Sequence, residues 1–403
     1  KINLSNAFCG FRHRSDGDFA PQNQPQFRKK GCFRYAKAMV INMSAFYNEI
    51  RRKSRKIRVG NLFIGGDAPL TVQSMTTARG YEGIYAQMKE LQEAGCDIVR
   101  MTVPDMENVR ILAKLKEQDI QMPIVADIHF DYRMAVEAAY AGADKVRINP
   151  GNIGSQEKVQ AVVQACRAKN IAIRVGVNSG SLEKSKLAKY GGVTPEALCE
   201  SALENVRLLE GYGFENIVVA VKSSSPYKMA AANRMIAQRC SYPLHLGVTE
   251  AGTLRLGETK GAAGIGGLLL SGIGDTLRVS LTADPVKEVL CGRRILDALG
   301  FGEGKLELVS CPTCGRTRID IIGISEEFER RMAAVPLKKH IKVAIMGCVV
   351  NGPGEAGDAD IGIAGGNGEA ILFKKGQTVR KVPENGLVDT LVEEVRRMDG
   401  ESE

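Results

Sequence analysis

The sequence has no uninterrupted apolar run long enough to cross a lipid bilayer, which takes roughly 20 residues. We therefore expect no membrane-spanning segment. The 403 residues are 44% hydrophobic and 25% charged, which is typical of a soluble globular protein. Because domains usually contain about 100–200 residues, this length favours one large domain and one small one.

Acidic residues are scarce at the start of the chain. Residues 1–60 contain 14 Lys or Arg against 3 Asp or Glu, a net charge of +11, so the remainder contributes −2 to the total of +9. No aromatic residue interleaves with the charges of "NEIRRKSRKIRVG", which is therefore interpreted as a solvated basic lead-in and not as a nucleic-acid site.

Residues 1–42 show neither a helical nor a strand period. They are Arg-rich and acid-poor, so a targeting extension is one alternative. Sequence translated upstream of a start at Met39 or Met43 is another. We interpret residues 1–42 as a disordered or artefactual extension, and we expect its deletion to leave activity intact.

The ten cysteines are too sparse and too irregularly spaced for a secreted disulfide framework. They favour a reducing compartment, the cytoplasm, with metal or redox use of some thiols. Those in or beside apolar stretches are expected to be buried and inert: Cys96, Cys166, Cys199, Cys240 and Cys291. Cys9 and Cys32 belong to the extension, which leaves Cys311 and Cys314 of "SCPTCG" and Cys348 of "GCVVNGPGEAGDADIGIAGG".

Short β-branched runs recur eight times along the chain. Most gaps between them carry sequence of helical period, such as "VRILAKLKEQ", and several of these segments stop at a glycine. A strand followed by a helix, eight times over, predicts a (β/α)8 TIM barrel, which we assign to residues 43–302. The runs begin at Leu70, Asp97, Pro123, Lys145, Ile171, Asn216, Tyr242 and Thr276.

The rhythm changes after "LGFGEGK", whose glycines suggest a linker near residues 300–305. The strand-like runs "KVAIMGC", "DIGIAGG" and "AILFKKG" and the helix-like runs "EEFERRMAAV" and "GLVDTLVEEVRRM" follow. They predict a small α+β domain over residues 303–403. This domain contains the three cysteines that remain to be explained.

Polar side chains are concentrated near the carboxyl ends of the predicted barrel strands, which is where barrel enzymes have their active sites. Five of them are cations on separate strands, and burying a charge without a partner is costly, so together they imply a bound anion. Arginine suits phosphate, and a diphosphate is the leading interpretation. A lone arginine would more often pair with a neighbouring helix, and Asp127 and His129 could equally be structural. The set is Arg100, Asp127, His129, Arg147, Asn149, Arg174, Asn178, Lys222, Glu250, Arg278 and Ser280.

The CxxC pair alone is a weak signal, because dithiol redox pairs, zinc sites and iron–sulfur sites all use it. Structural zinc takes four ligands, and the nearby His340 precedes a strand. Three cysteines with one different ligand suit a cubane iron–sulfur cluster, to which glycines around Cys348 would let backbone amides approach. The run "GAAGIGGLLLSGIGD" does not indicate dinucleotide binding, because it precedes a strand instead of following one.

Seven motifs together resemble one family, the 4-hydroxy-3-methylbut-2-enyl diphosphate synthases of the methylerythritol phosphate pathway of isoprene biosynthesis, in their bacterial two-domain form. They are "QSMTT", "VRINPGNIG", "RVGVNSGSL", "LGVTEAG", "GIGDTLRVSLT", "CPTCGR" and "MGCVVNGPGEA". The resemblance runs from about Ser44 to the end. It implies an iron–sulfur oxidoreductase that opens 2-C-methyl-D-erythritol 2,4-cyclodiphosphate and removes a hydroxyl as water, using two electrons from reduced flavodoxin or ferredoxin.

The resemblance also implies a role for particular residues. A [4Fe-4S] cluster would be held by Cys311, Cys314, Cys348 and Glu355. Glu250 would be the acidic catalytic residue that handles protons, unless it only orients an arginine. A homodimer is implied, with the cluster of one subunit facing the barrel of the other. The diphosphate would be bound by Arg100, Arg147, Arg174, Asn178, Lys222, Arg278 and Ser280.

Overall fold

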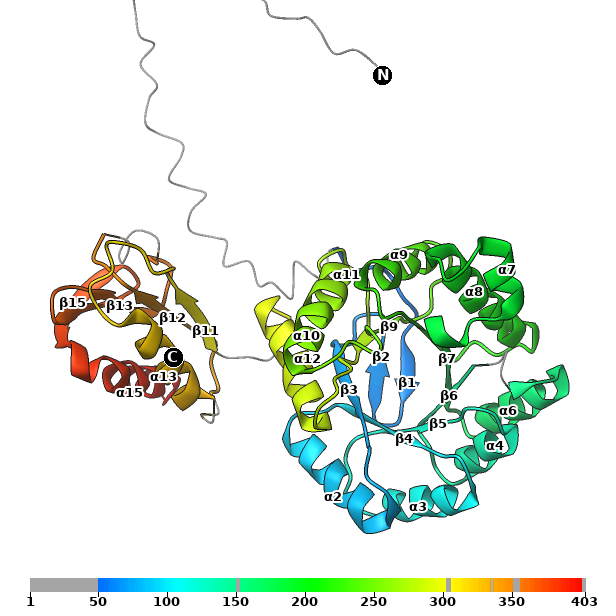
Figure 1. Ribbon diagram of the computed structural model, residues 1–403. Coiled ribbons are helices and arrows are strands. Elements are labelled where there is room, and N and C mark those ends of the chain that lie inside the picture. Colours follow the sequence, from blue (N-terminus) through cyan, green and yellow to red (C-terminus); the bar gives the residue numbers. More distant parts are fainter. Residues whose placement is uncertain are drawn as a thin grey trace, which may run out of the picture. The chain divides into compact units, whose positions relative to one another are not determined.

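The computed structural model describes residues 50–149, 153–301, 306–333, 335, 337–350 and 356–400, and it contains a parallel barrel (Figure 1). Its eight strands follow the order β8-β7-β6-β5-β4-β3-β10-β9. Parallel bridges from Val219 to Leu244 and from Ser223 to Val248 join β8 to the chain around β9 and complete the ring. The strands are β3 (Thr71–Met75), β4 (Ile98–Thr102), β5 (Ile124–Asp127), β6 (Lys145–Ile148), β7 (Ala172–Asn178), β8 (Ile217–Lys222), β9 (His245–Leu246) and β10 (Thr276–Leu277).

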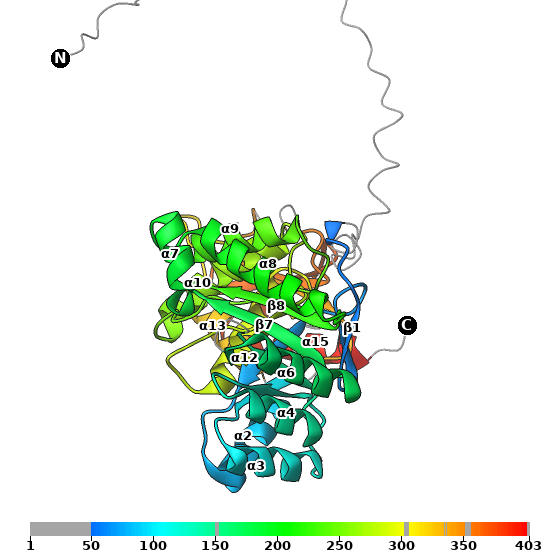
Figure 2. The ribbon, with the colours of Figure 1, turned by 90° about the vertical axis from the view of Figure 1, so that its right-hand side faces the viewer.

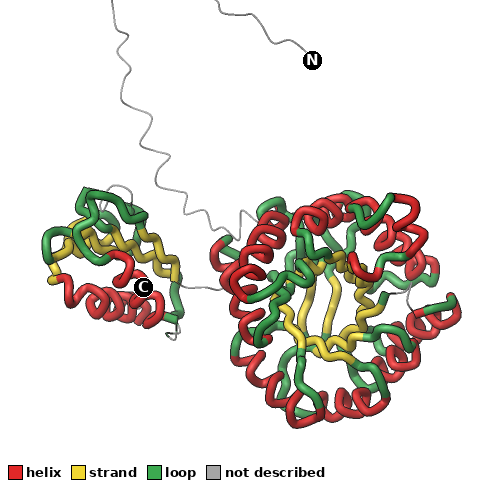
Figure 3. The backbone as a smooth tube through the Cα atoms, viewed as in Figure 1, coloured by secondary structure: helices red, strands yellow, loops and turns green. Residues whose placement is uncertain are grey.

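Helices surround this ring, and Figure 3 shows the strands inside and the helices outside. Each of the eight predicted runs contains one barrel strand, so the expected (β/α)8 barrel is confirmed. The helices are α2 (Gly80–Glu93), α3 (Met106–Lys116), α4 (Tyr132–Tyr140), α6 (Gln156–Ala168), α7 (Lys184–Tyr190), α8 (Pro195–Gly211), α9 (Pro226–Ala237), α10 (Leu254–Gly261), α11 (Gly267–Leu269) and α12 (Pro285–Ala298). The 3₁₀-helix η1 (Ser179–Ser181) follows β7, and the π-helix η2 (Ala262–Gly266) joins α10 to α11.

An antiparallel hairpin of β1 (Ile57–Val59) and β2 (Leu62–Ile64) packs on the amino-terminal end of the barrel. Its buried side chains Ile57, Val59 and Ile64 form one apolar cluster with the first inward-facing residues of four strands. Those residues are Ile98, Val125, Ala172 and Val218. Figure 2 shows the barrel from the side, with β1 at one end and α7 at the other.

The interpretation of this region as a solvated basic lead-in is wrong for Arg51 and Arg52, whereas the other basic side chains of the stretch are exposed. Arg51 is buried, and its Nη2 donates to Asp275 Oδ1 at 2.9 Å; Arg52 lies 3.6 Å from the same carboxylate. Ser54 Oγ also donates to Asp275, at 2.8 Å. Arg51 and Arg52 therefore attach the segment before the hairpin to the barrel instead of facing solvent.

The carboxyl-terminal domain is a five-stranded sheet with the order β11-β12-β13-β14-β15, in which β11, β12 and β13 are parallel and the last two are antiparallel. Helices α13 and α15 share one apolar core with the sheet, and a second core around Met346, Ala359 and Phe373 also includes sheet residues. β15 was not expected from the sequence. The elements are β11 (Leu306–Ser310), α13 (Ile321–Met332), β12 (Ile341–Met346), β13 (Ile361–Gly365), β14 (Glu369–Lys374), β15 (Gln377–Pro383), the 3₁₀-helix η3 (Glu384–Gly386) and α15 (Leu387–Gly400).

The predicted extension, residues 1–42, lies outside the described residues, as do linker residues 302–305 and Glu355. Within the described part of the chain, every helix is too short or too polar to cross a membrane.

Candidate active site

The cationic residues predicted from the sequence face the inside of the barrel at its carboxyl end. Ile98, Val125, Ala172 and Val218 meet at the opposite end, so residues an even number of positions further along the same strands also face inward. Those residues are Arg100, Asp127, Arg174, Asn178 and Lys222. Register pairing of Asp127 with Arg147 and of Arg147 with Arg174 places Arg147 beside these residues. We call the cations gathered at this end of the barrel the cationic ring.

Asp127 is the carboxylate that holds two of these cations in place. Arg147 Nη1 donates to Asp127 Oδ1 at 3.0 Å, and Arg100 Nε lies 3.5 Å from Oδ2. His129 Nε2 lies 3.8 Å from the same oxygen, although the His129 side chain is half exposed. Burial alone would raise the pKa of Asp127, but the charges of Arg100 and Arg147 outweigh it and lower that pKa. Asp127 therefore stays ionised and orients the cations.

Arg278, which follows β10, is oriented by a carboxylate that the sequence did not single out. Glu288 of α12 accepts from Arg278 Nε at 3.0 Å and from Nη2 at 3.1 Å, in the bidentate geometry that arginine favours. It also accepts from Ser74 Oγ at 3.1 Å and from the Leu281 amide at 3.0 Å. Glu288 is only 3% exposed, so a helix outside the barrel strands fixes the position of Arg278 at the mouth of the barrel.

Other cations of the ring lack such partners. Burial, followed by the nearby charges of other cations, lowers the pKa of Arg174 and of Lys222 well below their usual values. The pKa of Arg100 is lowered to about 10, again chiefly by burial. Among the described residues, the side chain of Arg174 has no hydrogen-bond partner at Nε or Nη1. This arrangement fits a bound anion, which would pair with Arg174 and favour the charged form of Lys222.

Two glycines, which the sequence did not indicate, make room for these cations. A Cβ atom at Gly176 would lie 2.5 Å from Arg147 Nε, and a Cβ at Gly247 would lie 2.8 Å from Lys222 Nζ. Both positions face inward, as alternation along β7 and β9 requires. A larger residue at either position would displace a cation.

Glu250, the predicted proton-handling residue, is exposed in the segment that follows Val248. Its φ of +51° lies in the left-handed region, which costs a non-glycine residue energy and often marks a functional position. Ser280 and Asn178 are half-buried at the carboxyl end of the barrel, and Asn149 is buried there. The residues between Asn149 and Ile153 lie outside the described part.

A second set of polar residues faces the barrel interior below the ring, and sequence reasoning missed it. Lys145, Gln73 and His245 are each fully buried. Lys145 and His245 begin their strands and Gln73 is mid-strand, so a search for polar residues at strand ends passes over them. A charged residue within an otherwise β-branched run would have been the usable signal.

The three remaining cysteines lie in the carboxyl-terminal domain, after neighbouring parallel strands. Ser310 pairs with Ile345, so Cys311 directly after β11 lies beside the end of β12, and the Gly347 amide donates to Cys311 Sγ at 3.2 Å. Cys348 is the next residue along. Cys314 lies in a turn that is attached to the same end of the sheet, because the Arg318 amide donates to the Gly347 carbonyl at 2.9 Å.

The donor set at this end of the sheet fits an iron–sulfur cluster. The backbone amide of Arg316 lowers the pKa of the exposed Cys314 thiol, and the Arg316 side chain adds to that effect, which favours the thiolate that ligates iron. The amide of Gly347 provides the kind of hydrogen bond that cluster sulfurs receive. Among the described residues, no three His, Cys, Asp or Glu side chains lie close enough to hold a metal ion, and Glu355 is not among them.

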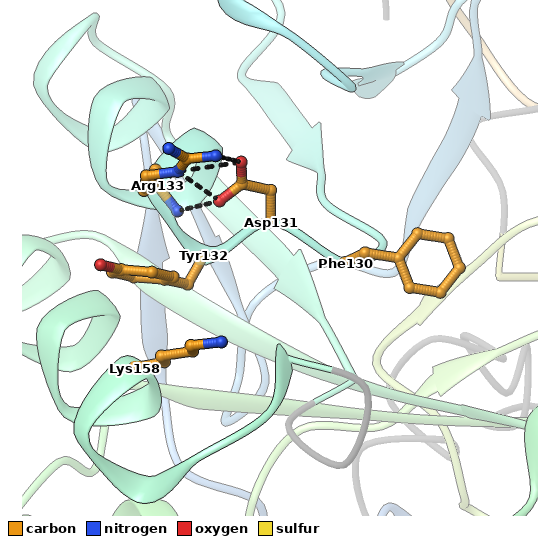
Figure 4. A pocket seen from close by; sticks show the side chains of 5 residues that line it. All are labelled: Phe130, Asp131, Tyr132, Arg133 and Lys158. Atoms are coloured by element: carbon orange, nitrogen blue, oxygen red, sulfur yellow. Dashed lines mark hydrogen bonds and ion pairs between the residues drawn. The ribbon is translucent and has the colours of Figure 1, made fainter.

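A surface hollow of about 420 Å³ lies at the starts of α4 and α6 (Figure 4). Asp131 forms ion pairs with Arg133, at 2.7 Å from Nη2, and Lys158 Nζ lies 5.9 Å from the ring centroid of Tyr132. Phe130, which is 75% exposed, points away from the other four side chains. The hollow is open to solvent, and its one carboxylate, Asp131, is paired with Arg133, so it lacks the buried cations of the ring.

A closed TIM barrel whose mouth collects buried cations defines an enzyme that acts on a phosphate-bearing substrate. More particularly, the chain belongs to the GcpE family: the model of the GcpE TIM-barrel domain matches residues 54–293, and that of the GcpE protein C-terminal domain matches residues 307–397.

The relatives named 4-hydroxy-3-methylbut-2-en-1-yl diphosphate synthase (flavodoxin) agree over most of the chain. The protein of Clostridium perfringens is 55% identical over 85% of this chain and 98% of its own length. That of Geobacter sulfurreducens is 52% identical over 87% of this chain and 99% of its own length. Among solved structures, dihydropteroate synthase from Xanthomonas albilineans has a TM-score of 0.43 and 15% identity, over 60% of this chain and 99% of that one, which is too low to carry an argument.

Proposed function

We propose that this chain carries out the reductive ring opening and dehydration of 2-C-methyl-D-erythritol 2,4-cyclodiphosphate, with the ring of cations as its diphosphate site. The reaction yields 4-hydroxy-3-methylbut-2-en-1-yl diphosphate, the compound in the names of its relatives. The observation that carries the proposal is the set of buried, insufficiently paired cations on separate strands of the barrel mouth. The proposed substrate ligands are Arg100, Arg147, Arg174, Asn178, Lys222, Arg278 and Ser280.

Each cation has a physical task in this proposal. Arg147 and Arg278 are held by Asp127 and Glu288, so they can orient phosphate oxygens with little loss of side-chain freedom. Arg174 and Lys222 are already stripped of water, so their attraction to the diphosphate is stronger than at a solvated site. Binding at these positions would fix the ring of the substrate for opening.

The [4Fe-4S] cluster is proposed to be held by Cys311, Cys314, Cys348 and Glu355. When bound, such a cluster supplies single electrons and a Lewis-acidic iron. Glu355 is a harder ligand than a thiolate and would leave iron more readily. The Gly347 amide, already directed at Cys311 Sγ, would stabilise the charge on that sulfur.

Glu250 is proposed to handle the proton that leaves with the hydroxyl as water. Its carboxylate is exposed on the segment after Val248, and its left-handed backbone is the kind of strained conformation found at functional positions.

Reduced flavodoxin is the proposed electron donor, with ferredoxin as the alternative. The cytoplasm is the proposed location, because the described cysteines are all free thiols.

We also propose that the barrel domain spans residues 43–302 and the cluster domain spans residues 303–403, and that the protein forms a homodimer.

Anaerobic purification followed by metal analysis and substrate titration tests the proposal. We expect a brown protein with iron and sulfide, and cyclodiphosphate affinity that falls about 10- to 100-fold in Arg174→Met, because a hydrogen bond to a charged group contributes about 1.5–3 kcal/mol. The matched control Arg133→Met removes an exposed arginine and should bind normally.

Three results would contradict the assignment. Colourless protein with zinc would indicate a structural zinc module. Activity that survives Cys348→Ala but not Cys311→Ala would indicate a dithiol oxidoreductase. Unchanged cyclodiphosphate affinity in Arg174→Met would show that the cationic ring is not the substrate-binding site.

A further inference from the structure

Below the cationic ring, and sharing Arg174 with it, the barrel interior has a group of buried polar side chains, which we call the polar floor: Thr71, Gln73, Lys145, Arg174, His245 and Thr276. Register pairing of Thr276 with both Thr71 and His245 places three of them side by side around the barrel. Lys145 and Arg174 face inward from the neighbouring strands β6 and β7, with Lys145 in register with Ala172 and Arg174 two residues further along. The polar floor therefore draws residues from five strands to adjacent levels of the interior.

Most hydrogen-bonding atoms of the polar floor have no partner within the part of the chain that the structure describes. These atoms are Lys145 Nζ, both amide atoms of Gln73, Arg174 Nε and Nη1, His245 Nε2 and Thr71 Oγ1. The exception is His245 Nδ1, which lies 3.4 Å from Thr276 Oγ1. If the threonine hydroxyl donates to Nδ1, His245 Nε2 carries the proton and becomes a further donor. Unpaired donors thus predominate in this layer.

Two of these donors, Lys145 and Arg174, are cations with no carboxylate at hand. Asp144 is the carboxylate whose charge acts on Lys145, but its Oδ2 is occupied by Lys116 Nζ at 2.8 Å and by the Ile124 amide at 2.7 Å. Asp127 is taken by Arg147 and Arg100. Burial, and then the charges of Arg174, Lys222 and Lys145, lower the pKa of His245, so its imidazole is neutral.

The charge of the whole interior points the same way. Among the described residues, the inward-facing cations are Arg100, Lys145, Arg147, Arg174, Lys222 and Arg278, whereas Asp127 and Glu288 are the carboxylates that contact them. Each phosphate of a cyclic diphosphate has one ionisable oxygen, so this substrate would leave part of the charge uncompensated. A lysine can lose its proton, but an arginine cannot, which leaves Arg174 in need of an anionic acceptor.

We propose that a small inorganic anion of halide size binds in the polar floor between Lys145, Arg174 and His245, beneath the diphosphate site. Lys145 and Arg174 supply the charge, and the amide of Gln73 and Nε2 of His245 supply neutral donors. The anion keeps the inner edge of Arg174 paired whether or not substrate occupies the mouth. This inference rests on the interior of the barrel alone and does not depend on the proposed reaction.

Bromide is the probe. The melting temperature of the purified holoprotein is measured with increasing sodium bromide, with sodium gluconate at equal ionic strength as the reference for an anion too large to enter. A ligand that binds only the folded state stabilises it in proportion to the logarithm of its concentration above Kd. We expect a rise specific to bromide in the wild type, and at least a tenfold loss of bromide affinity in Lys145→Met.

Lys89→Met is the matched control, because Lys89 pairs with Asp119 on the surface; it should keep the bromide response. Crystals grown in bromide should show anomalous scattering between Lys145, Arg174 and His245, and this test remains available if Lys145→Met does not fold. An equal bromide response in wild type and Lys145→Met, or density for water only at that position, would overturn the proposal. Anomalous density without any response in solution would show binding at crystal concentration only, and would overturn it too.

Discussion

The space available to two cations at the barrel mouth is set by glycines on neighbouring strand segments. Gly176 leaves room for Arg147, and Gly247 leaves room for Lys222. Arg147 can move its long side chain aside, but it then loses its position relative to Asp127. These glycines therefore control where phosphate oxygens can be met, without touching the substrate themselves.

Gly176→Ala tests this effect. The new Cβ would lie 2.5 Å from Arg147 Nε, so we expect a folded protein whose affinity for the cyclodiphosphate is about 10- to 100-fold weaker, as for loss of one charged hydrogen bond. Gly267→Ala is the control, because no atom outside its own stretch of helix lies within 4 Å of the place where the new methyl group would sit. Substrate titration by calorimetry measures both, and equal affinities for the two variants would contradict the idea.

The lowered pKa values of Lys222 and Lys145 predict a pH dependence of binding. Burial comes first among the causes, and in both cases neighbouring cations lower the pKa further. A bound diphosphate raises these pKa values again, so binding takes up protons between the lowered value and the usual value of about 10.4. Affinity should rise as pH falls through that window.

Calorimetry in two buffers with different ionisation enthalpies measures the proton uptake. Lys222→Met should reduce it, because one of the groups that gains a proton is removed. Proton release on binding, or an uptake unchanged in Lys222→Met, would show that these lysines are already fully charged without substrate.

At the scale of single residues, the sequence predicted the cations of the ring better than the residues that hold those cations in place. Arginines late in β-branched runs were visible because charge is unusual there, and all of them face the interior at the expected end. Glu288 was missed because an acidic residue on a helix is ordinary, and only the fold brings it to Arg278. Gly176 was missed because close approach of a side chain from another strand leaves no local signal.

Among the elements, α12 does more than cover the barrel. Through Glu288 it joins the end of β3 at Ser74, the cation Arg278 and the backbone of Leu281. One buried carboxylate thus fixes the last strand connection relative to the first strand of the ring.

Glu288→Gln is expected to loosen this junction. It leaves Arg278 without its charged partner in a buried setting, and breaking such a pair costs about 3–5 kcal/mol. The melting temperature should fall by several degrees and cyclodiphosphate affinity should fall with it. Glu327→Gln, at an exposed pair with Arg330, is the control and should change neither. A melting temperature unchanged in Glu288→Gln would mean that α12 is held by apolar packing alone.

The elements that the sequence failed to predict share a physical feature. Strands β1 and β2 have three residues each, too few to show a period, and they lie among basic residues that normally indicate solvent. In β15 nearly all side chains are exposed, so no alternation marks it as a strand. Pairing with a neighbouring strand creates these elements, and a pattern confined to one segment does not contain that pairing.

For the whole molecule, the proposed function requires the cysteines of one domain to work with the cations of another. In the proposed homodimer, a subunit lacking Arg147 would still offer its cysteine domain, and a subunit lacking Cys348 would still offer its barrel.

Mixing Arg147→Ala chains with Cys348→Ala chains should therefore restore activity. About a quarter of the wild-type rate is expected if equal amounts of the two chains exchange freely, since half of the dimers are mixed and each mixed dimer keeps one intact pair. The rate of each variant alone is the control. Mixtures that remain as inactive as the separate variants, despite proven subunit exchange, would mean that each chain works on its own.

The hairpin of β1 and β2 has a kinetic consequence. Ile57, Val59 and Ile64 close the amino-terminal end of the barrel. The linear diphosphate must therefore leave through the carboxyl end, where the cyclic one enters. Product should therefore inhibit in strict competition with substrate, so that turnover slows as product accumulates and recovers when substrate is added in excess.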